Sequence, residues 1–257
     1  MRNNKPYFLQ EASNISYPHF TIVCGKDGEE CIFSVTGLGD LTVSYFVDGE
    51  ENKEVYNITD EVTIAVTITE TYGERMRINL YGNNIEDVTI LEQTLALEVN
   101  KNPTLHGIAI NESAYNAKQI DVRNCKELWS FGCVGVSLES VNLTKNKLLS
   151  DFGASEINKL DINDCPNISR VAFSAFPADT PIPAPSAIAI SGKTFIGEIV
   201  FTGNGVANED NLKETIIALI ESSTRRGSVE FSKATISDTL REEIESIVGN
   251  YGWAAYF

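Results

Sequence analysis

Apolar and polar residues alternate along residues 18 to 92 with the two-residue period of β-strands. Gly and Asp turn signals separate the alternating runs, among them Lys26-Asp27-Gly28 and Asp48-Gly49-Glu50. The pattern predicts a small antiparallel β-sandwich over residues 1–93. The apolar positions of its strands are Phe20, Ile22 and Cys24; Ile32, Phe33 and Val35; Leu41, Val43 and Tyr45; Val62, Ile64, Val66 and Ile68; and Met76, Ile78 and Leu80.

From residue 97 onward the apolar pattern becomes an internal repeat. Segments starting at Leu97, Ile120, Val141, Leu160 and Ile188 all carry apolar residues at offsets 0, 2, 8, 11 and 13. Offsets 0 and 2 predict one inward-facing strand, and offsets 11 and 13 predict a second. Residues 94–201 are therefore predicted to form a solenoid of stacked coils. A partial first coil is predicted from residue 78, with Ile78, Leu80, Val88 and Ile90 in the matching positions.

The turn between the two predicted strands has its own pattern at offset 5. This position holds Asn102, Cys125, Asn146, Cys165 and Lys193 in successive repeats. An amide side chain at a turn can hydrogen-bond backbone groups that the strands leave unpaired. We therefore expect the Asn residues of this column to bind backbone groups at the turn.

The period changes again after the proline-rich stretch between residues 177 and 185. Leu212, Ile216, Leu219 and Ile220 share one helical face, and a strand follows at residues 229–231. A second helix, capped at Thr235, Ser237 or Asp238, turns Leu240, Ile244, Ile247 and Val248 inward, and a last strand covers residues 253–257. Because a solenoid needs its last coil covered, residues 202–257 are predicted to be an α/β cap.

Two segments carry a family resemblance. Leu138-x-x-Val141-x-Leu143-x-x-Asn146-x-Leu148 and Ile157-x-x-Leu160-x-Ile162-x-x-Cys165 resemble the leucine-rich-repeat pattern, in the form found in bacterial BspA-like surface proteins. The preceding β-domain, with its Val47-Asp48-Gly49 turn, is similar to a PKD-like or Ig-like module. The resemblance implies a mainly β fold, a sandwich followed by a leucine-rich-repeat solenoid, in a surface or adhesion protein.

Charge and composition limit the choice of partner. The 257 residues include 20 Lys and Arg against 36 Asp and Glu, a net charge of −16. Binding to a phosphate backbone needs clustered cations, so we expect no nucleic-acid partner. No apolar run approaches the roughly 20 residues of a membrane span, so no membrane insertion is expected.

The N-terminus bears on localisation. In MRNNKPYFLQEASN the only apolar patch is Tyr7, Phe8 and Leu9, far short of a signal-peptide core. A trimmed export signal would predict an extracellular or cell-surface protein. If this start is the native one, a cytoplasmic or virion-associated protein is predicted.

The sequence offers little chemistry for catalysis, metals or cofactors. Five cysteines, an odd number in a chain this long, argue against a disulfide scaffold. Only Cys24 and Cys31, opposite each other across a tight turn, are placed for either a bridge or the packing of two free thiols. His19 and His106 lie in no metal or relay spacing. Ser191-Gly192-Lys193-Thr194 resembles a phosphate-binding loop, but Ala187 stands where its first Gly belongs. We expect no enzyme activity, no metal and no cofactor.

The outward positions of the first strand column are the candidate ligand-binding surface. They are small, polar and mildly acidic, and the candidate residues are Tyr81, Glu98, Asp121, Arg123, Asn142, Asp161 and Asn163. A protein or a glycan is the expected partner. The leading hypothesis is a non-enzymatic, surface-exposed binding or adhesion module. The alternative is a structural spacer or scaffold, phage tail-associated or in the cell envelope, with no small-molecule ligand.

Overall fold

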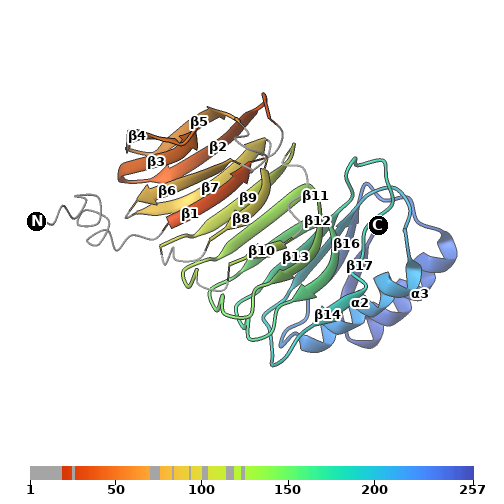
Figure 1. Cartoon of the computed structure of the whole chain (residues 1–257). Helices are drawn as coiled ribbons and strands as arrows, with labels where there is room; N and C mark the ends of the chain where they lie inside the picture. Colours follow the sequence, from red (N-terminus) through yellow and green to blue (C-terminus); the bar gives the residue numbers. More distant parts are fainter. Residues whose placement is uncertain are drawn as a thin grey trace, which may run out of the picture.

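The computed structural model describes residues 19–24, 27–69, 76–82, 84–92, 94–99, 104–113, 119–122 and 125–257. Over these ranges the protein is mainly β, with two helices near the C-terminus (Figure 1). The helices are α2 (Glu209–Ser222) and α3 (Asp238–Asn250). The strands are β1 (His19–Cys24), β2 (Glu30–Gly37), β3 (Gly39–Val47), β4 (Glu50–Ile58), β5 (Glu61–Thr67), β6 (Arg77–Gly82), β7 (Ile85–Glu92), β8 (Thr94–Glu98), β9 (Gly107–Ser113), β10 (Gln119–Asp121), β11 (Ser130–Asn142), β12 (Asp151–Asp161), β13 (Arg170–Ser174), β14 (Ala187–Ala189), β15 (Glu198–Thr202), β16 (Ser228–Ser232) and β17 (Ala254–Tyr256).

The strands form two ladders that run the length of the molecule. The first ladder has the order β4-β3-β6-β1-β8-β10-β11-β12-β14. The second has the order β5-β2-β7-β9-β11-β12-β13-β15-β16-β17. The pairs within β1 to β7 and the pair β1–β8 are antiparallel, whereas β7–β9, β8–β10 and the later pairs are parallel. The long strands β11 and β12 belong to both ladders, because their register shifts between Cys133 and Ser137.

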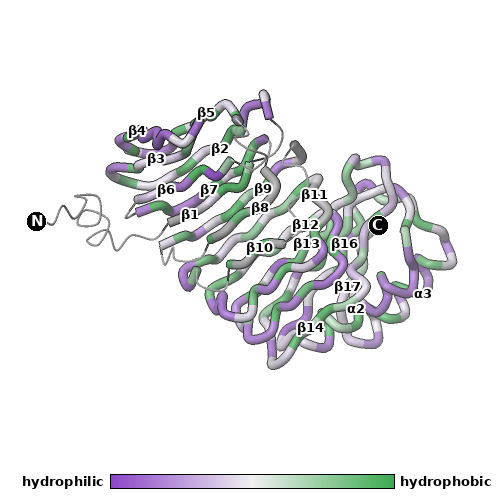
Figure 2. Tube along the Cα trace, in the orientation of Figure 1, coloured by the Kyte–Doolittle hydropathy of each residue, from purple (hydrophilic) through white to green (hydrophobic). Residues whose placement is uncertain are grey.

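The repeat registers predicted from the sequence are confirmed residue by residue. In the first ladder Leu97 pairs with Ile120, and the series continues through Val141 and Leu160 to Ile188. The offset-11 residues form the matching series in the second ladder, namely Ile108, Phe131, Phe152, Val171 and Ile199, and Val88 of the partial coil, which is one residue short, precedes them. Nearly all of these side chains are fully buried, in one core that runs from Phe20 to Trp253. Figure 2 shows the resulting alternation of hydrophobic and hydrophilic positions along the strands.

One strand interrupts the first ladder where the antiparallel part meets the repeats. The sequence predicts that Ile78 and Leu80 occupy the same column as Leu97. They do, but β1 lies between them, with Ile22 paired to Ile78 on one side and to Leu97 on the other. In the second ladder no strand intervenes, and β7 pairs directly with β9.

Strands β1 and β2 do not form the expected hairpin. β1 pairs with β6 and β8, whereas β2 pairs with β5 and β7, so the expectation that Cys24 and Cys31 oppose each other as hairpin partners is wrong. The two thiols nevertheless meet inside the core, where both are fully buried and neither forms a disulfide. Their mutual hydrogen bond, together with burial, raises the pKa of the Cys24 thiol.

The offset-5 side chains close the turns, as predicted for Asn146. Its Nδ2 donates to the carbonyl oxygens of Val122 (2.9 Å) and Cys125 (2.7 Å) in the preceding repeat. The thiols in the same column do likewise: Cys125 donates to the Val99 carbonyl at 3.6 Å, and Cys165 to the Leu143 carbonyl at 3.2 Å. Asn102 lies outside the described residues.

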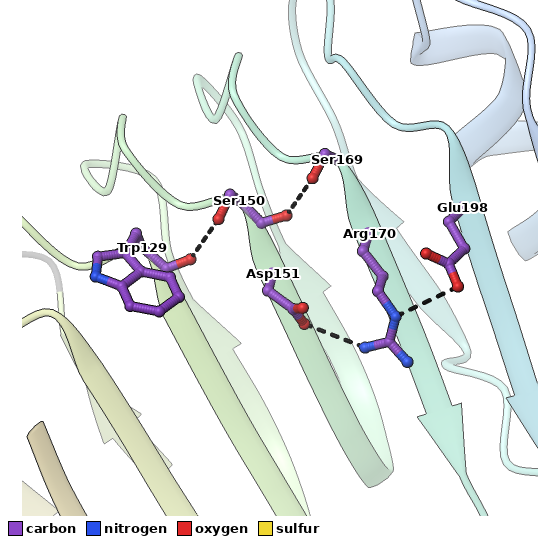
Figure 3. A network of polar contacts seen from close by, with 6 residues as sticks. All are labelled: Trp129, Ser150, Asp151, Ser169, Arg170 and Glu198. Carbon is purple, nitrogen blue, oxygen red and sulfur yellow. Dashed lines mark hydrogen bonds and ion pairs between the residues drawn. The ribbon is translucent and has the colours of Figure 1, made fainter.

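A polar strip runs along the outer edge of the second ladder (Figure 3). The Ser150 hydroxyl donates to the Trp129 carbonyl, and the Ser169 hydroxyl donates to the Ser150 carbonyl, each at 3.0 Å. Beside them the Arg170 guanidinium lies between Asp151 (3.3 Å) and Glu198 (3.6 Å). Each bond joins one repeat to the next.

The C-terminal segment extends the second ladder. The predicted helical faces are buried, except that Ile247 is half-buried, and Asn208 and Ser237 cap the two helices. β16 and β17 then continue the column, with Ile199 paired to Val229 and Val229 to Ala255. Phenylalanine rings contact one another along the whole series Phe131, Phe152, Phe173, Phe201, Phe231 and Phe257, at centroid separations of 5.1 to 6.3 Å. Helices therefore replace the first-ladder strand in the last two turns of the chain.

Candidate functional site

A shallow groove of about 320 Å³ lies on the outward face of the first ladder, across β11, β12 and β14. Its polar lining consists of Ser140, Asn142, Lys159 and Asp161. The parallel register explains why these side chains meet: Ser140 is level with Lys159, and Asn142 is level with Asp161. Neighbouring parallel strands are about 4.8 Å apart, so each level pair lies side by side on the surface.

Two alanines give the groove its depth. Ala187 is level with Lys159, and Ala189 is level with Asp161. Because a methyl group is the whole side chain at each position on β14, the longer side chains of β12 stand above them. The groove therefore has a polar wall and an apolar floor.

Local hydrogen bonds fix the orientation of two lining side chains. The Asn142 side-chain oxygen accepts from the Thr144 N–H (3.1 Å) and the Thr144 hydroxyl (2.9 Å). One repeat later the Asp161 side-chain oxygen Oδ1 accepts from the Asn163 N–H (3.1 Å). Such bonds from a side chain to the backbone two residues on are characteristic of Asn and Asp at chain turns.

The orientation leaves complementary groups available in the groove. Among the described residues, no partner is found for the Asn142 amide N–H groups, the Asp161 oxygen Oδ2 or the Lys159 ammonium. The groove thus offers donors, an acceptor and one charge of each sign over a few ångströms. This set can bind hydroxyl or amide groups of a ligand.

The predicted site residues are brought together only in part. Asn142 and Asp161 line the groove, whereas Asn163, two residues after Asp161, is half-buried and does not line it. The backbone register places Glu98 and Asp121 in the same row, on β8 and β10. Tyr81, expected at the edge of this surface, is separated from β8 by β1, and Arg123 lies outside the described residues.

Ser140 and Lys159 line the groove but were not among the residues predicted to bind a ligand. Both are outward-facing in the repeat register, so their level with Asn142 and Asp161 could have been read from the sequence. The signal that would have singled them out is Ala at both outward positions of the next strand, since a groove needs short side chains on one side.

The cysteines do not contribute to the groove. All five are buried, and none forms a disulfide. Burial raises the pKa of both Cys133 and Cys165 to about 12, and at Cys165 the nearby Asp161 and Asp164 charges add to it. Since the thiolate is the reactive form, these thiols are suited to packing and turn closure.

In the described part of the chain, no group of three or more His, Cys, Asp or Glu side chains is arranged to hold a metal ion. Neither helix of that part is long and apolar enough to cross a membrane.

Comparison with known proteins gave no match among protein families, characterised proteins or solved structures. The groove and its surroundings are therefore interpreted from their own geometry.

Proposed function

We propose that this protein is a non-enzymatic, surface-exposed binding or adhesion module, built as a β-sandwich followed by a leucine-rich-repeat solenoid of the BspA-like kind. The architecture is supported by the constant register of both parallel ladders and by the Asn or Cys side chain that closes successive turns. Stacked repeats of this type present broad surfaces on which binding residues can vary without disturbing the core.

The observation that carries the binding role is the groove over β11, β12 and β14. Asn142 and Asp161 are held by bonds to their own backbone, so a ligand would meet groups that are already oriented. The mixture of an amide, a carboxylate, an ammonium and a hydroxyl above an alanine floor suits a polar, uncharged partner such as a glycan or an extended stretch of protein backbone.

The test is binding of the purified protein to an array of glycans and extracellular-matrix proteins. A ligand found on the array is then titrated against Ala189→Trp, which fills the groove, and Lys159→Ala, which removes its cation. We expect Ala189→Trp to weaken binding at least tenfold. Lys159→Ala should weaken it less.

Matched controls lie outside the groove. Ala207→Trp adds the same side chain at another exposed alanine, and Asn158→Ala trims an exposed side chain of β12 that does not line the groove. If Ala189→Trp binds the array ligand as well as Ala207→Trp does, the groove is not the binding site. Absence of any array ligand would favour a spacer or scaffold role.

A further inference from the structure

A second hollow, of about 490 Å³, lies at the C-terminal end of the molecule. It is formed where the chain leaves each helix for the following strand, by the connection from α2 to β16 and the connection from α3 to β17. The lining residues that matter here are Glu221, Thr224, Arg225, Arg226, Tyr251 and Trp253. None of them belongs to the groove on the first ladder.

Hydrogen bonds hold the two connections in place. The Thr224 N–H and hydroxyl both donate to the Thr194 carbonyl, each at 3.0 Å. The Trp253 N–H donates to the Val248 carbonyl, and the next N–H, that of Ala254, donates to the Gly227 carbonyl, each at 3.0 Å. Because these contacts exist without a ligand, little ordering is needed when one binds.

Glycines leave the space that the two guanidiniums occupy. The Arg225 guanidinium lies over the Phe195 ring, 4.5 Å from its centroid, and a β-carbon on Gly197 would come within 2.2 Å of it. Arg226 crosses Gly252, whose φ of +69° favours glycine, and a β-carbon there would lie 3.1 Å from the Arg226 Nε atom. Both arginines thus rest on bare backbone.

The hollow carries a positive charge in an acidic protein. Among the described residues, no carboxylate forms an ion pair with Arg225 or Arg226. The one acid in the lining, Glu221, accepts a hydrogen bond from the Tyr251 hydroxyl at 2.7 Å, which raises the pKa of Tyr251. Two guanidiniums against one carboxylate leave the lining with a net positive charge, and the Lys193 ammonium, which donates to the Glu221 carbonyl oxygen at 3.0 Å, adds a further cation; the whole chain carries −16.

We propose that this hollow binds a sugar residue bearing a single carboxylate, of the uronic-acid class. A guanidinium presents paired N–H groups that match the two oxygens of a carboxylate. The guanidinium groups suit the one carboxylate that each residue of a uronic-acid chain carries, and the Glu221 carboxylate would repel the second charge of a phosphate ester. The volume lies within the range of small-molecule sites.

The rest of the lining favours a hydroxylated ring. Glu221 Oε1 is taken by Tyr251, and its other oxygen can accept from a sugar hydroxyl. Tyr251 is 41% exposed and Trp253 is largely covered, so aromatic surface borders the hollow on one side. Aromatic rings beside polar groups suit the C–H face of a sugar. This hollow and the groove share no residues, so ligand binding at one site is tested independently of ligand binding at the other.

The test uses the full chain and isothermal titration calorimetry, with digalacturonate as the probe and a neutral galactose disaccharide as its uncharged counterpart. We expect digalacturonate to bind and the neutral disaccharide to bind at least tenfold more weakly. Arg226→Gln should weaken digalacturonate binding at least tenfold. Arg226→Lys, which keeps the charge but not the paired N–H groups, should restore only part of it.

The matched control is Arg241→Gln. Arg241 is exposed on α3 and lies over Phe257, 4.9 Å from the ring centroid, so its removal deletes the same charge at the same end of the molecule without changing the hollow. Wild-type affinity is expected for this variant, and also for Ala189→Trp, which blocks only the groove.

Several results would overturn the proposal. These are equal binding of the neutral disaccharide, an effect of Arg241→Gln as large as that of Arg226→Gln, or no effect of Arg226→Gln. If a sulfated or phosphorylated galactose binds more tightly than digalacturonate, the hollow does not select a carboxylate and the proposal is wrong. So would binding of a short peptide through its free C-terminal carboxylate, with no binding of digalacturonate.

Discussion

Polar side chains play different parts in the antiparallel hairpin β3–β4 and in the parallel repeats around β11 to β13. In the hairpin they bind other side chains across the two strands. The Ser44 hydroxyl donates to Glu51 (2.7 Å), the Tyr45 hydroxyl to Glu54 (2.8 Å), and the Asn57 amide to Asp40 (3.0 Å). Asp40, Glu51, Glu54 and Asn57 are exposed, whereas Tyr45 is half-buried and Ser44 is buried.

In the repeats the corresponding side chains bind the backbone of the preceding repeat. Asn146, Ser150 and Ser169 each donate to a carbonyl oxygen about 20 residues earlier in the chain. Asn146 is fully buried, and among the described residues its oxygen Oδ1 has no hydrogen-bond partner, so the two bonds made by Nδ2 offset the burial of that acceptor.

This difference indicates where polar contacts matter for stability. An exposed pair of side chains competes with water and contributes below about 1 kcal/mol. A hydrogen bond to a buried backbone carbonyl has no such competitor, and its loss leaves a group that water cannot reach. We therefore expect polar substitutions in the repeats to cost more than those in the hairpin.

The largest effect should come from the aromatic series, which sets the upper end of the scale. Phe152→Ala removes a fully buried ring between Phe131 and Phe173, so it should lower the free energy of unfolding by about 3–5 kcal/mol. Urea denaturation measures the loss. Phe257→Ala, at the 38% exposed end of the series, is the control and should cost far less. Similar losses for the two variants would mean that the series is not a continuous part of the core.

Asn146→Leu tests the buried turn contact. It removes both hydrogen bonds made by Nδ2, and we expect a loss of about 1–3 kcal/mol in the free energy of unfolding. This loss is smaller than the cost of leaving two buried carbonyl groups without any hydrogen bond. The reason is that the Val122 and Cys125 carbonyls also accept backbone N–H groups. Asn146→Cys supplies the residue type found at positions 125 and 165 and should recover part of the loss. If Asn146→Leu is as stable as wild type, polar contacts to the backbone of the repeats do not contribute more to stability than those between side chains of the hairpin.

Ser169→Ala tests the half-exposed strip of Figure 3. Removing the bond from the Ser169 hydroxyl to the Ser150 carbonyl should cost about 0.5–1.5 kcal/mol. Ser174→Ala removes a hydroxyl for which the described residues show no partner, and it should change stability by less. A larger loss from Ser174→Ala would contradict the assigned contact.

Glu54→Gln should have the smallest effect, below about 1 kcal/mol at neutral pH. Hydrogen bonds from Tyr56 and Tyr45 hold the pKa of the Glu54 carboxyl below its usual value of 4.5. A lowered pKa stabilises the folded state above pH 4.5, and this contribution is lost as the pH falls through the lowered value. The stability difference between wild type and Glu54→Gln should therefore shrink with acidification. If the stability difference between wild type and Glu54→Gln grows on acidification, the pKa of Glu54 is not lowered in the folded state.

The same variant has a spectroscopic signature. Burial, followed by the contact with Glu54, raises the pKa of Tyr56 to about 12. Without the carboxylate, we expect the pKa of Tyr56 to move back toward 10, which an absorbance titration of tyrosinate detects as a difference from wild type. An unchanged titration would mean that burial alone sets the Tyr56 pKa.

The repeats were predictable to the residue, whereas the N-terminal strands were not. A recurring column such as Leu97, Ile120 and Val141 identifies both the inward face and the neighbouring strand, because successive repeats stack in chain order. Alternation in Phe20, Ile22 and Cys24 identifies only the face. The partners of β1 are β6, more than 50 residues away, and β8, and no local signal points to either.

The two binding surfaces also differ in how far the sequence predicts them. The row containing Asn142 and Asp161 follows from the repeat register, but the depth of the groove depends on Ala187 and Ala189, one strand further on. The C-terminal hollow was missed because it joins two connections that are separated by α3 and brought together only by the fold. Its one sequence signal is Arg225-Arg226, two adjacent cations in an acidic chain.

The constant register also makes one repeat a unit of length. In the stretch from β9 to β13, each strand meets its neighbours through the same inward columns, with Ile108, Phe131 and Phe152 in one series. A gene that gained or lost one such unit would lengthen or shorten the molecule by about 4.8 Å and leave the neighbours of every retained side chain chemically alike. The distance between the groove and the C-terminal hollow could therefore change in small steps during evolution, without redesign of either site.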